Sequence, residues 1–124
     1  MKTIKEQIDI IIGATALHFD VQAKKIKEKG RSGRVVIARH MAIALVKRSV
    51  KPTLTLKEIG HHFGKRDHST VINSCKKADD LYQWDSKFRQ TTHDVITRIQ
   101  LMIDTRQQYC NPVRFYKLAP CVSL

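Results

Sequence analysis

Apolar residues recur at steps of three and four positions along most of this chain, and this spacing is typical of amphipathic helices. Glycines and basic residues interrupt the pattern over residues 29–34, and Pro52 disfavours helical geometry in the residue before it, so loops are expected there. We therefore predict an all-α fold, a helical bundle. The helices predicted in the first half of the chain cover residues 4–19, 22–28 and 35–49.

Two further helices are predicted on either side of Gly64, which can adopt the positive φ of a tight turn. Thr55 and Glu58 have the spacing of a capping box and begin a helix over about 56–62. Asp67 is expected to cap the second helix, which has an apolar side and an opposite side of small polar residues. This arrangement predicts a helix-turn-helix, whose second helix enters the major groove of DNA.

The last helical pattern covers about residues 81–108 and predicts a long C-terminal helix, with Asp85 and Ser86 as a point of interruption. Its apolar side is interpreted as core or as a packing face. Asn111 and Pro112 end the pattern. The predicted organisation is one helix-turn-helix domain over residues 1–108, with an N-terminal helix 4–19, a core 20–80 and a C-terminal helix of about 81–108, followed by an irregular tail over 109–124. The apolar side of the last helix is formed by Leu81, Trp84, Phe88, Val95, Ile99 and Met102.

The charge of the chain predicts a polyanionic partner, with nucleic acid favoured over a membrane surface. Lys and Arg number 23 against 11 Asp and Glu, which gives a net charge of +12. From Lys24 to Lys51 there are ten Lys or Arg and a single acid, Glu28. This basic segment precedes the predicted helix-turn-helix and is expected to flank it on a duplex.

Other classes of protein are disfavoured. The apolar runs are too short and too interrupted for a signal peptide or a membrane span, so a cytoplasmic, nucleoid-associated protein is expected. The three cysteines are not paired in spacing, and the group His61, His62, His68 and Cys75 lacks the spacing of a zinc site. With no carboxylate cluster and no phosphate-binding loop motif, we expect no enzyme activity, no metal, no nucleotide and no other cofactor.

Residues 63–71 read FGKRDHSTV and are followed by Cys75, Lys76 and Lys77. This run resembles the signature of the C-terminal DNA-binding domain of the DnaA chromosomal replication initiator. The resemblance extends upstream through residues 58–60, 38–42 and 19–21 and spans about residues 4–100. It implies a helix-turn-helix fold that binds double-stranded DNA at DnaA-box-like sites.

By position, the resemblance implies that Arg31 enters the minor groove, where a narrow groove concentrates negative potential. Arg39 corresponds to a second groove or phosphate contact, and Lys47 to a backbone contact. Asp67 has two open interpretations, as a helix cap or as an acceptor from a cytosine amino group. The expected DNA contacts are Arg31, Arg34, Arg39, His40, Lys47, Lys65, Arg66, Asp67, His68, Ser69, Thr70, Asn73, Ser74 and Lys77.

Several residues differ from those that are common in the family. His40 stands where Gln is common, Asn73 where His is frequent, Ser74 where Ala often meets a thymine methyl, and Gly33 where a basic residue is usual. The resemblance therefore implies a DNA-binding domain without defining the base sequence that it prefers.

These observations support two alternative hypotheses for the function of the chain. The first is sequence-specific binding of duplex DNA in the regulation of replication or transcription, without an ATPase domain, for which 124 residues leave no room. The second is an adaptor that keeps the fold and binds another protein, or a second copy of itself, through the helix of about 81–108. The retained run at residues 66–71 favours the first.

Overall fold

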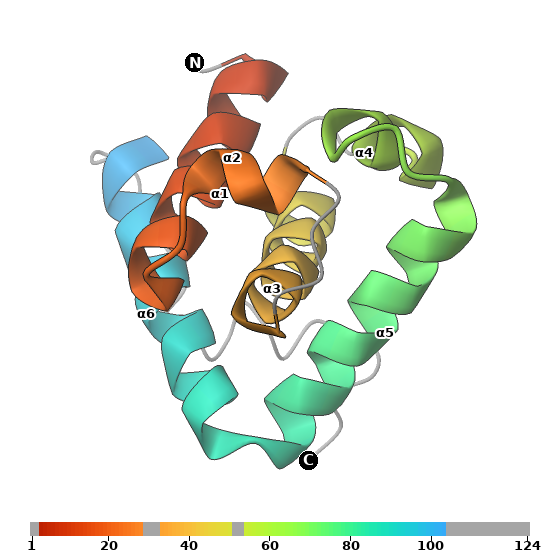
Figure 1. Ribbon diagram of the computed structural model, residues 1–124. Coiled ribbons are helices and arrows are strands. Elements are labelled where there is room, and N and C mark those ends of the chain that lie inside the picture. The colour runs from red at the N-terminus through yellow and green to blue at the C-terminus, as the bar shows by residue number, and fades with distance from the viewer. Residues whose placement is uncertain (1–2, 29–32, 51–53, 104–124) are drawn as a thin grey trace.

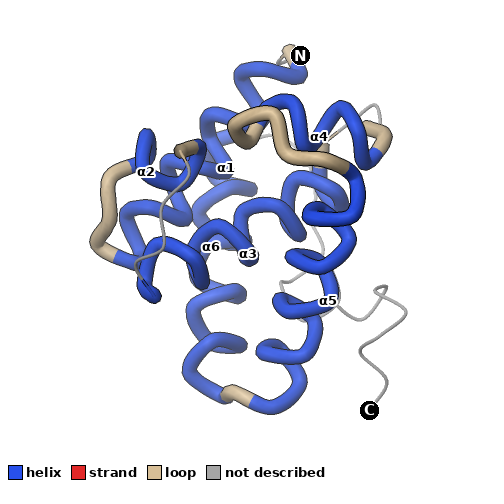
Figure 2. Tube along the Cα trace, turned by 45° about the vertical axis from the view of Figure 1, so that its right-hand side comes forward, coloured by secondary structure: helices blue, strands red, loops and turns tan. Residues whose placement is uncertain are grey.

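The computed structural model describes residues 3–28, 33–50 and 54–103, and all regular structure in these ranges is helical (Figure 2). Figure 1 shows α3 in the middle of the molecule, with α5 and α6 on its two sides meeting at one end. The predicted all-α bundle with a helix-turn-helix is confirmed. The six helices in the described ranges are α1 (Ile4–Phe19), α2 (Ala23–Lys27), α3 (Gly33–Ser49), α4 (Leu56–His62), α5 (His68–Trp84) and α6 (Ser86–Ile103).

Capping boxes begin two of the helices. At α1, the Thr3 hydroxyl accepts from the Glu6 N–H and the Glu6 carboxylate accepts from the Thr3 N–H, both at 3.1 Å. The predicted box at α4 is confirmed, because Thr55 and Glu58 exchange the same two bonds at 3.2 and 3.0 Å. These side chains satisfy backbone donors that the first helical turn leaves unpaired.

α3 is the central helix of the core. Four successive residues, Ile43 to Val46, have no exposed surface, so this part of the helix is covered on every side. α1, α2, α4 and α5 all pack against α3, while α6 packs against α1 and α5. The largest fully buried side chains are Ile8, Ile11, Ile12, Ile26, Met41, Ile43, Leu45, Val46, Val50, Ile59 and Phe63.

An ion pair joins α3 to α5 inside this packing. The Arg48 guanidinium lies 2.6 Å from the Asp79 carboxylate, and the two side chains are only 16% and 5% exposed. Little water reaches these groups, so their mutual attraction offsets part of the cost of burying the two charges.

The predicted C-terminal helical segment is divided at Asp85, where the sequence predicts an interruption. Residues 81–84 form the last turn of α5, and the Asp85 carboxylate accepts from the Lys87 and Phe88 N–H groups at 3.0 and 3.2 Å, which starts α6 afresh. The break also separates Trp84 from the apolar side of α6, and Trp84 is 78% exposed instead of packed. Residues 104–108 and the predicted tail 109–124 lie outside the described residues.

Candidate nucleic-acid interface

The turn between α4 and α5 is closed by hydrogen bonds to a single carbonyl. The Phe63 and Arg66 N–H groups donate to the Gly60 oxygen at 3.1 and 2.8 Å, and the Phe63 side chain is fully buried. Gly64 has the positive φ that the sequence predicts, at 82°, and Lys65 follows at 58°. The chain therefore reverses tightly, and α5 begins close against α4.

Gly60 makes this close approach possible, a role that sequence reasoning missed. A Cβ atom at Gly60 would lie 2.0 Å from the Arg66 carbonyl oxygen and 3.3 Å from Cγ2 of Val71. Because the first of these contacts is with backbone, the turn could not keep its position beside any side chain at residue 60.

Asp67 caps α5, which confirms one of the two interpretations of this acid. Its carboxylate accepts from the Thr70 N–H and from the Thr70 hydroxyl, both at 2.9 Å. These two hydrogen bonds hold the pKa of the Asp67 carboxyl below its ordinary value. The Asp67 carboxylate is thus occupied by the first turn of the helix that it caps. The hydroxyl of the half-buried Thr70 is held by the same carboxylate.

One face of α5 is exposed and carries polar and basic side chains, namely His68, Ser69, Asn73, Lys76 and Lys77, together with Ile72. Ile72 is 40% exposed and was missed as a candidate. The expected contact at Ser74 is corrected, because this side chain is 3% exposed. Ser74 lies three residues after Val71 and four before Ala78, and this spacing places it on the side of α5 that packs into the core.

Arg39 also differs from its expected role as a direct DNA contact. Its side chain is 4% exposed and lies against the end of α2. The guanidinium donates to three backbone carbonyls, from Nε to Ile26 at 2.8 Å and from Nη2 to Lys25 at 3.0 Å and Glu28 at 2.6 Å. Arg39 thus binds the protein backbone in this structure.

Arg66 shares one of these carbonyls. Its Nη2 donates to the Glu28 oxygen at 3.0 Å, and the residue remains partly exposed. Partial burial lowers the pKa of Arg66. The pKa of Arg39 is lowered first by burial and then by the positive charge of Arg66. Two guanidinium groups therefore lie close together on one side of the turn.

His40 lies in these positive surroundings. It is half-buried, and among the described residues its enclosed Nδ1 has no hydrogen-bond partner. Burial lowers the pKa of His40, and the charges of Arg39, Lys77 and Arg66 lower it further. The lowered pKa favours the neutral imidazole, and the positive charge around it comes from α3, the turn and α5.

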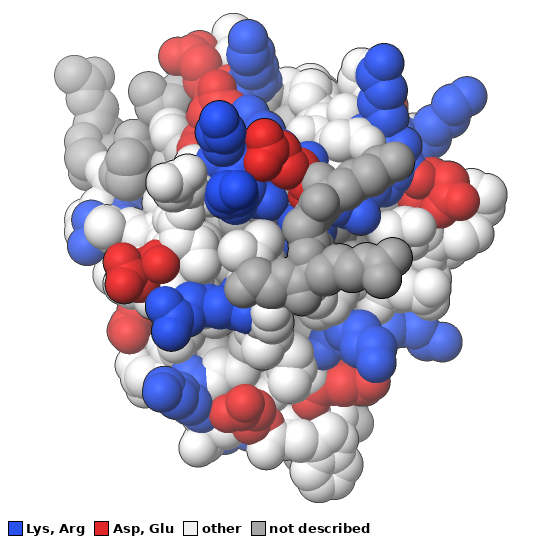
Figure 3. Space-filling view, viewed as in Figure 1, with Lys and Arg blue, Asp and Glu red and all other residues white. Residues whose placement is uncertain are grey.

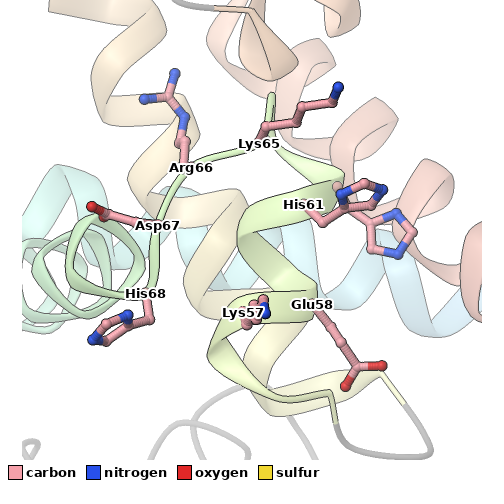
Figure 4. Close-up of a pocket in the computed structure, with 8 residues that line it drawn as sticks. Lys57, Glu58, His61, Lys65, Arg66, Asp67 and His68 are labelled. Carbon is pink, nitrogen blue, oxygen red and sulfur yellow. The ribbon is translucent and has the colours of Figure 1, made fainter.

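A groove runs between α4, the turn and the start of α5. Figure 4 shows Arg66, Asp67 and His68 along the connection into α5, with Lys65 and His61 on the α4 side. In Figure 3, Lys and Arg side chains gather over α2 and α4 in the upper part of the view, with fewer acidic side chains among them. The residues that line the groove are Lys57, Glu58, His61, His62, Lys65, Arg66, Asp67 and His68.

The remaining predicted contacts are on α3 or outside the described ranges. Arg34 and Lys47 are both exposed, the first near the start of α3 and the second near its end. Arg34 lines a different groove, together with His18 of α1 and Lys87 of α6. Arg31 lies outside the described residues. The structure therefore brings three groups of predicted DNA contacts together: the residues of the turn, the exposed face of α5, and His40. Arg34 lies apart from them.

The described ranges do not offer the geometry of a metal site or a membrane span. No three His, Cys, Asp or Glu side chains in these ranges converge as metal ligands would. None of the helices described is long and apolar enough to cross a bilayer.

Comparison with known proteins finds similarity to the same family in the family model and in the individual relatives. The family described as the bacterial dnaA protein helix-turn-helix matches residues 8–78. The chromosomal replication initiator protein DnaA of Flavobacterium psychrophilum is 32% identical over 103 residues, which are 82% of this chain and 21% of that protein. The protein of the same name from Nostoc punctiforme is 33% identical over 93 residues, which are 75% of this chain and 20% of that protein. The chain spans about a fifth of the length of these relatives.

Proposed function

Because this chain belongs to the bacterial DnaA helix-turn-helix family, we propose that it binds specific sequences of double-stranded DNA with α5 in the major groove. The observation that supports this most directly is the exposed face of α5. It presents short polar side chains at Ser69 and Asn73, with Lys76 and Lys77 beside them. Short polar groups reach base edges, while lysines contact phosphates.

The proposed contacts divide into two kinds. Ser69, Asn73 and His68 are proposed to contact base edges, because they are exposed on the first turns of α5, and Ile72 adds an apolar surface that suits a thymine methyl. Phosphate contacts are proposed for the exposed or half-exposed basic residues of the turn and of this face, Lys65, Arg66, Lys76 and Lys77. By position in the family, Lys47 near the end of α3 is proposed as a further phosphate contact, and Arg31 is proposed for the minor groove.

The proposed role is to occupy DnaA-box-like sites in the control of replication or transcription. Such a role needs only the DNA-binding geometry described above, and it requires no catalytic group or bound cofactor in this domain. We place this function at the bacterial nucleoid, where duplex DNA is the polyanion that the +12 charge suits.

Selection of bound sites from random duplexes, repeated at two salt concentrations, tests the proposal. Ser69→Ala should relax the base preference at one position of the selected site. Lys77→Ala should weaken all sites alike and lower the slope of log K against log salt by about one unit. Lys87→Ala is a matched control, because it removes an exposed lysine from α6 and should leave this slope unchanged. Equal binding of every duplex would refute sequence-specific recognition.

A protein partner on α1 and α6 is the second candidate function. Leu17 and Leu101 are 61% and 64% exposed, and Arg98 of α6 donates to His18 of α1 at 3.3 Å, so the two helices lie side by side there. The candidate partner is another protein or a second copy of the chain. Sedimentation and pull-down with Leu17→Ser and Leu101→Ser would test it. Binding of a protein in the absence of any duplex binding would favour this function over the first.

A further inference from the structure

The Arg39 side chain is bound in a way that few other side chains could reproduce. Its planar guanidinium directs donors to the carbonyls of Lys25, Ile26 and Glu28 at once. A lysine in the same place would present one ammonium group and could not match this fork. The contacts are therefore specific to arginine, and they use donors that a direct phosphate contact would need.

These contacts fix the end of a helix that has little stability of its own. α2 comprises only residues Ala23–Lys27, and a helix this short is not stable in isolation. The last carbonyls of a helix have no partner within it. Since Arg39 belongs to the buried side of α3, it attaches the end of α2 to the central helix of the domain.

The end of α2 in turn touches the turn of the helix-turn-helix. Arg66 donates to the Glu28 carbonyl, and a Cβ atom at Gly64 would lie 2.5 Å from the Lys27 carbonyl oxygen. The backbones of α2 and the turn are thus in direct contact (Figure 4 shows Arg66 at this side of the turn). Any displacement of α2 would move the acceptor that orients Arg66.

We propose that Arg39 is a positioning residue for DNA binding: it holds the α2 carbonyls so that Glu28 orients Arg66 beside the start of the recognition helix. This inference rests on the proposed function. The pKa of Arg39 is lowered by burial and by the positive charge of Arg66, in keeping with the two guanidinium groups lying close together. A phosphate on Arg66 would relieve this repulsion.

A double-mutant cycle tests the proposal. Affinities for a selected duplex are measured for Arg39→Lys, for Arg66→Ala and for the double variant, with Arg34→Lys as the same substitution at an exposed position of α3. Arg39→Lys should weaken binding about tenfold, the size of one charge-assisted hydrogen bond. In the Arg66→Ala background it should weaken binding by no more than about twofold, and Arg34→Lys should stay within about twofold in either background.

Amide hydrogen exchange gives a readout that does not depend on DNA. In Arg39→Lys, exchange should become faster at the Glu28 N–H, which donates to Lys24, and at the Arg66 N–H, which donates to Gly60. This acceleration should exceed any change at the amides of α6, which report the stability of the whole domain. A tenfold loss of affinity that persists in the Arg66→Ala background would overturn the proposal, because Arg39 would then act independently of Arg66.

Failure of the proposed function would look different. If the wild-type chain binds no duplex, exchange alone decides the positioning role, and unchanged rates at Glu28 and Arg66 would overturn it. If Arg39→Lys does not fold, Arg66→Lys replaces it. Arg66→Lys keeps the positive charge, so the slope of log K against log salt should stay unchanged, while the affinity for the duplex should fall about tenfold. An affinity equal to that of the wild type would overturn the proposal.

Discussion

Replacing Gly60 by alanine should destabilise the domain, although alanine is the better helix former. The added methyl group would lie 2.0 Å from the Arg66 carbonyl oxygen and 3.0 Å from its carbon. Neither atom belongs to a flexible side chain, so the turn itself must move away from α4. That movement stretches the Arg66 N–H bond to the Gly60 carbonyl, now 2.8 Å.

The magnitude follows from three opposing effects. Alanine favours the helix over glycine by about 1 kcal/mol. Inserting a group into a packed site costs about 1–3 kcal/mol, and the weakened hydrogen bond about 0.5–1.5 kcal/mol more. Because the clash is with backbone, we expect the upper part of the first range and a net loss of about 2 kcal/mol. For a domain of this size each kcal/mol shifts the Tm by about 4–8 °C.

Gly13→Ala is the matched control for this substitution. Gly13 lies within α1, is exposed, and has no atom within 4 Å of the position that its Cβ would take. Only the helix propensity and the chain entropy then change, and both favour alanine by about 0.5–1 kcal/mol. Thermal melts followed by circular dichroism should therefore show Tm changes of opposite sign. A Tm for Gly60→Ala at or above that of the wild type would refute the close packing described for the turn.

Three further substitutions probe the turn, the core and the cap. Gly64→Ala places a side chain at a φ of 82° against an α2 carbonyl, so the same melts should show a lower Tm, and an unchanged Tm would contradict the turn geometry. Asp79→Ala leaves the Arg48 charge largely buried without its 2.6 Å partner, and urea unfolding should show a loss of about 3–5 kcal/mol. A loss below about 1 kcal/mol would contradict the burial of the pair. The Asp67 pKa is lowered in the folded state, so its contribution to stability is complete at neutral pH and is lost as the pH falls through the lowered pKa, below about 4. Asp67→Asn should shrink this acid-induced loss in unfolding measured against pH, and identical acid profiles for both proteins would rule the cap charge out as its source.

The sequence predicted those features that depend on neighbouring residues. Helical spacing located α1 and α3 because each buries a side against the rest of the bundle, and the roles of Thr55 and Asp67 followed from backbone donors only three residues away. The burial of Ser74 is also a local feature, since its spacing from Val71 and Ala78 puts it on the packed side of α5.

Other features depend on residues far apart in the chain. The binding of Arg39 to the end of α2 joins residues 11 to 14 positions apart, and the clash at Gly60 arises only when the turn folds back on α4. No periodicity or cap encodes such contacts. A resemblance matches residue types by position and does not show whether a side chain faces solvent. Arg39 was therefore expected to contact DNA, whereas its guanidinium binds backbone carbonyls.

The packing of α3 has a consequence for how the domain behaves as a whole. Since α1, α2, α4 and α5 each rest on it, no one of these helices can detach without exposing part of its apolar surface to water. The described helices should therefore unfold together in one cooperative transition. A duplex bound to α5 would then slow amide exchange even in α1, on the other side of α3, because the only route to open exchange there is unfolding of the whole unit.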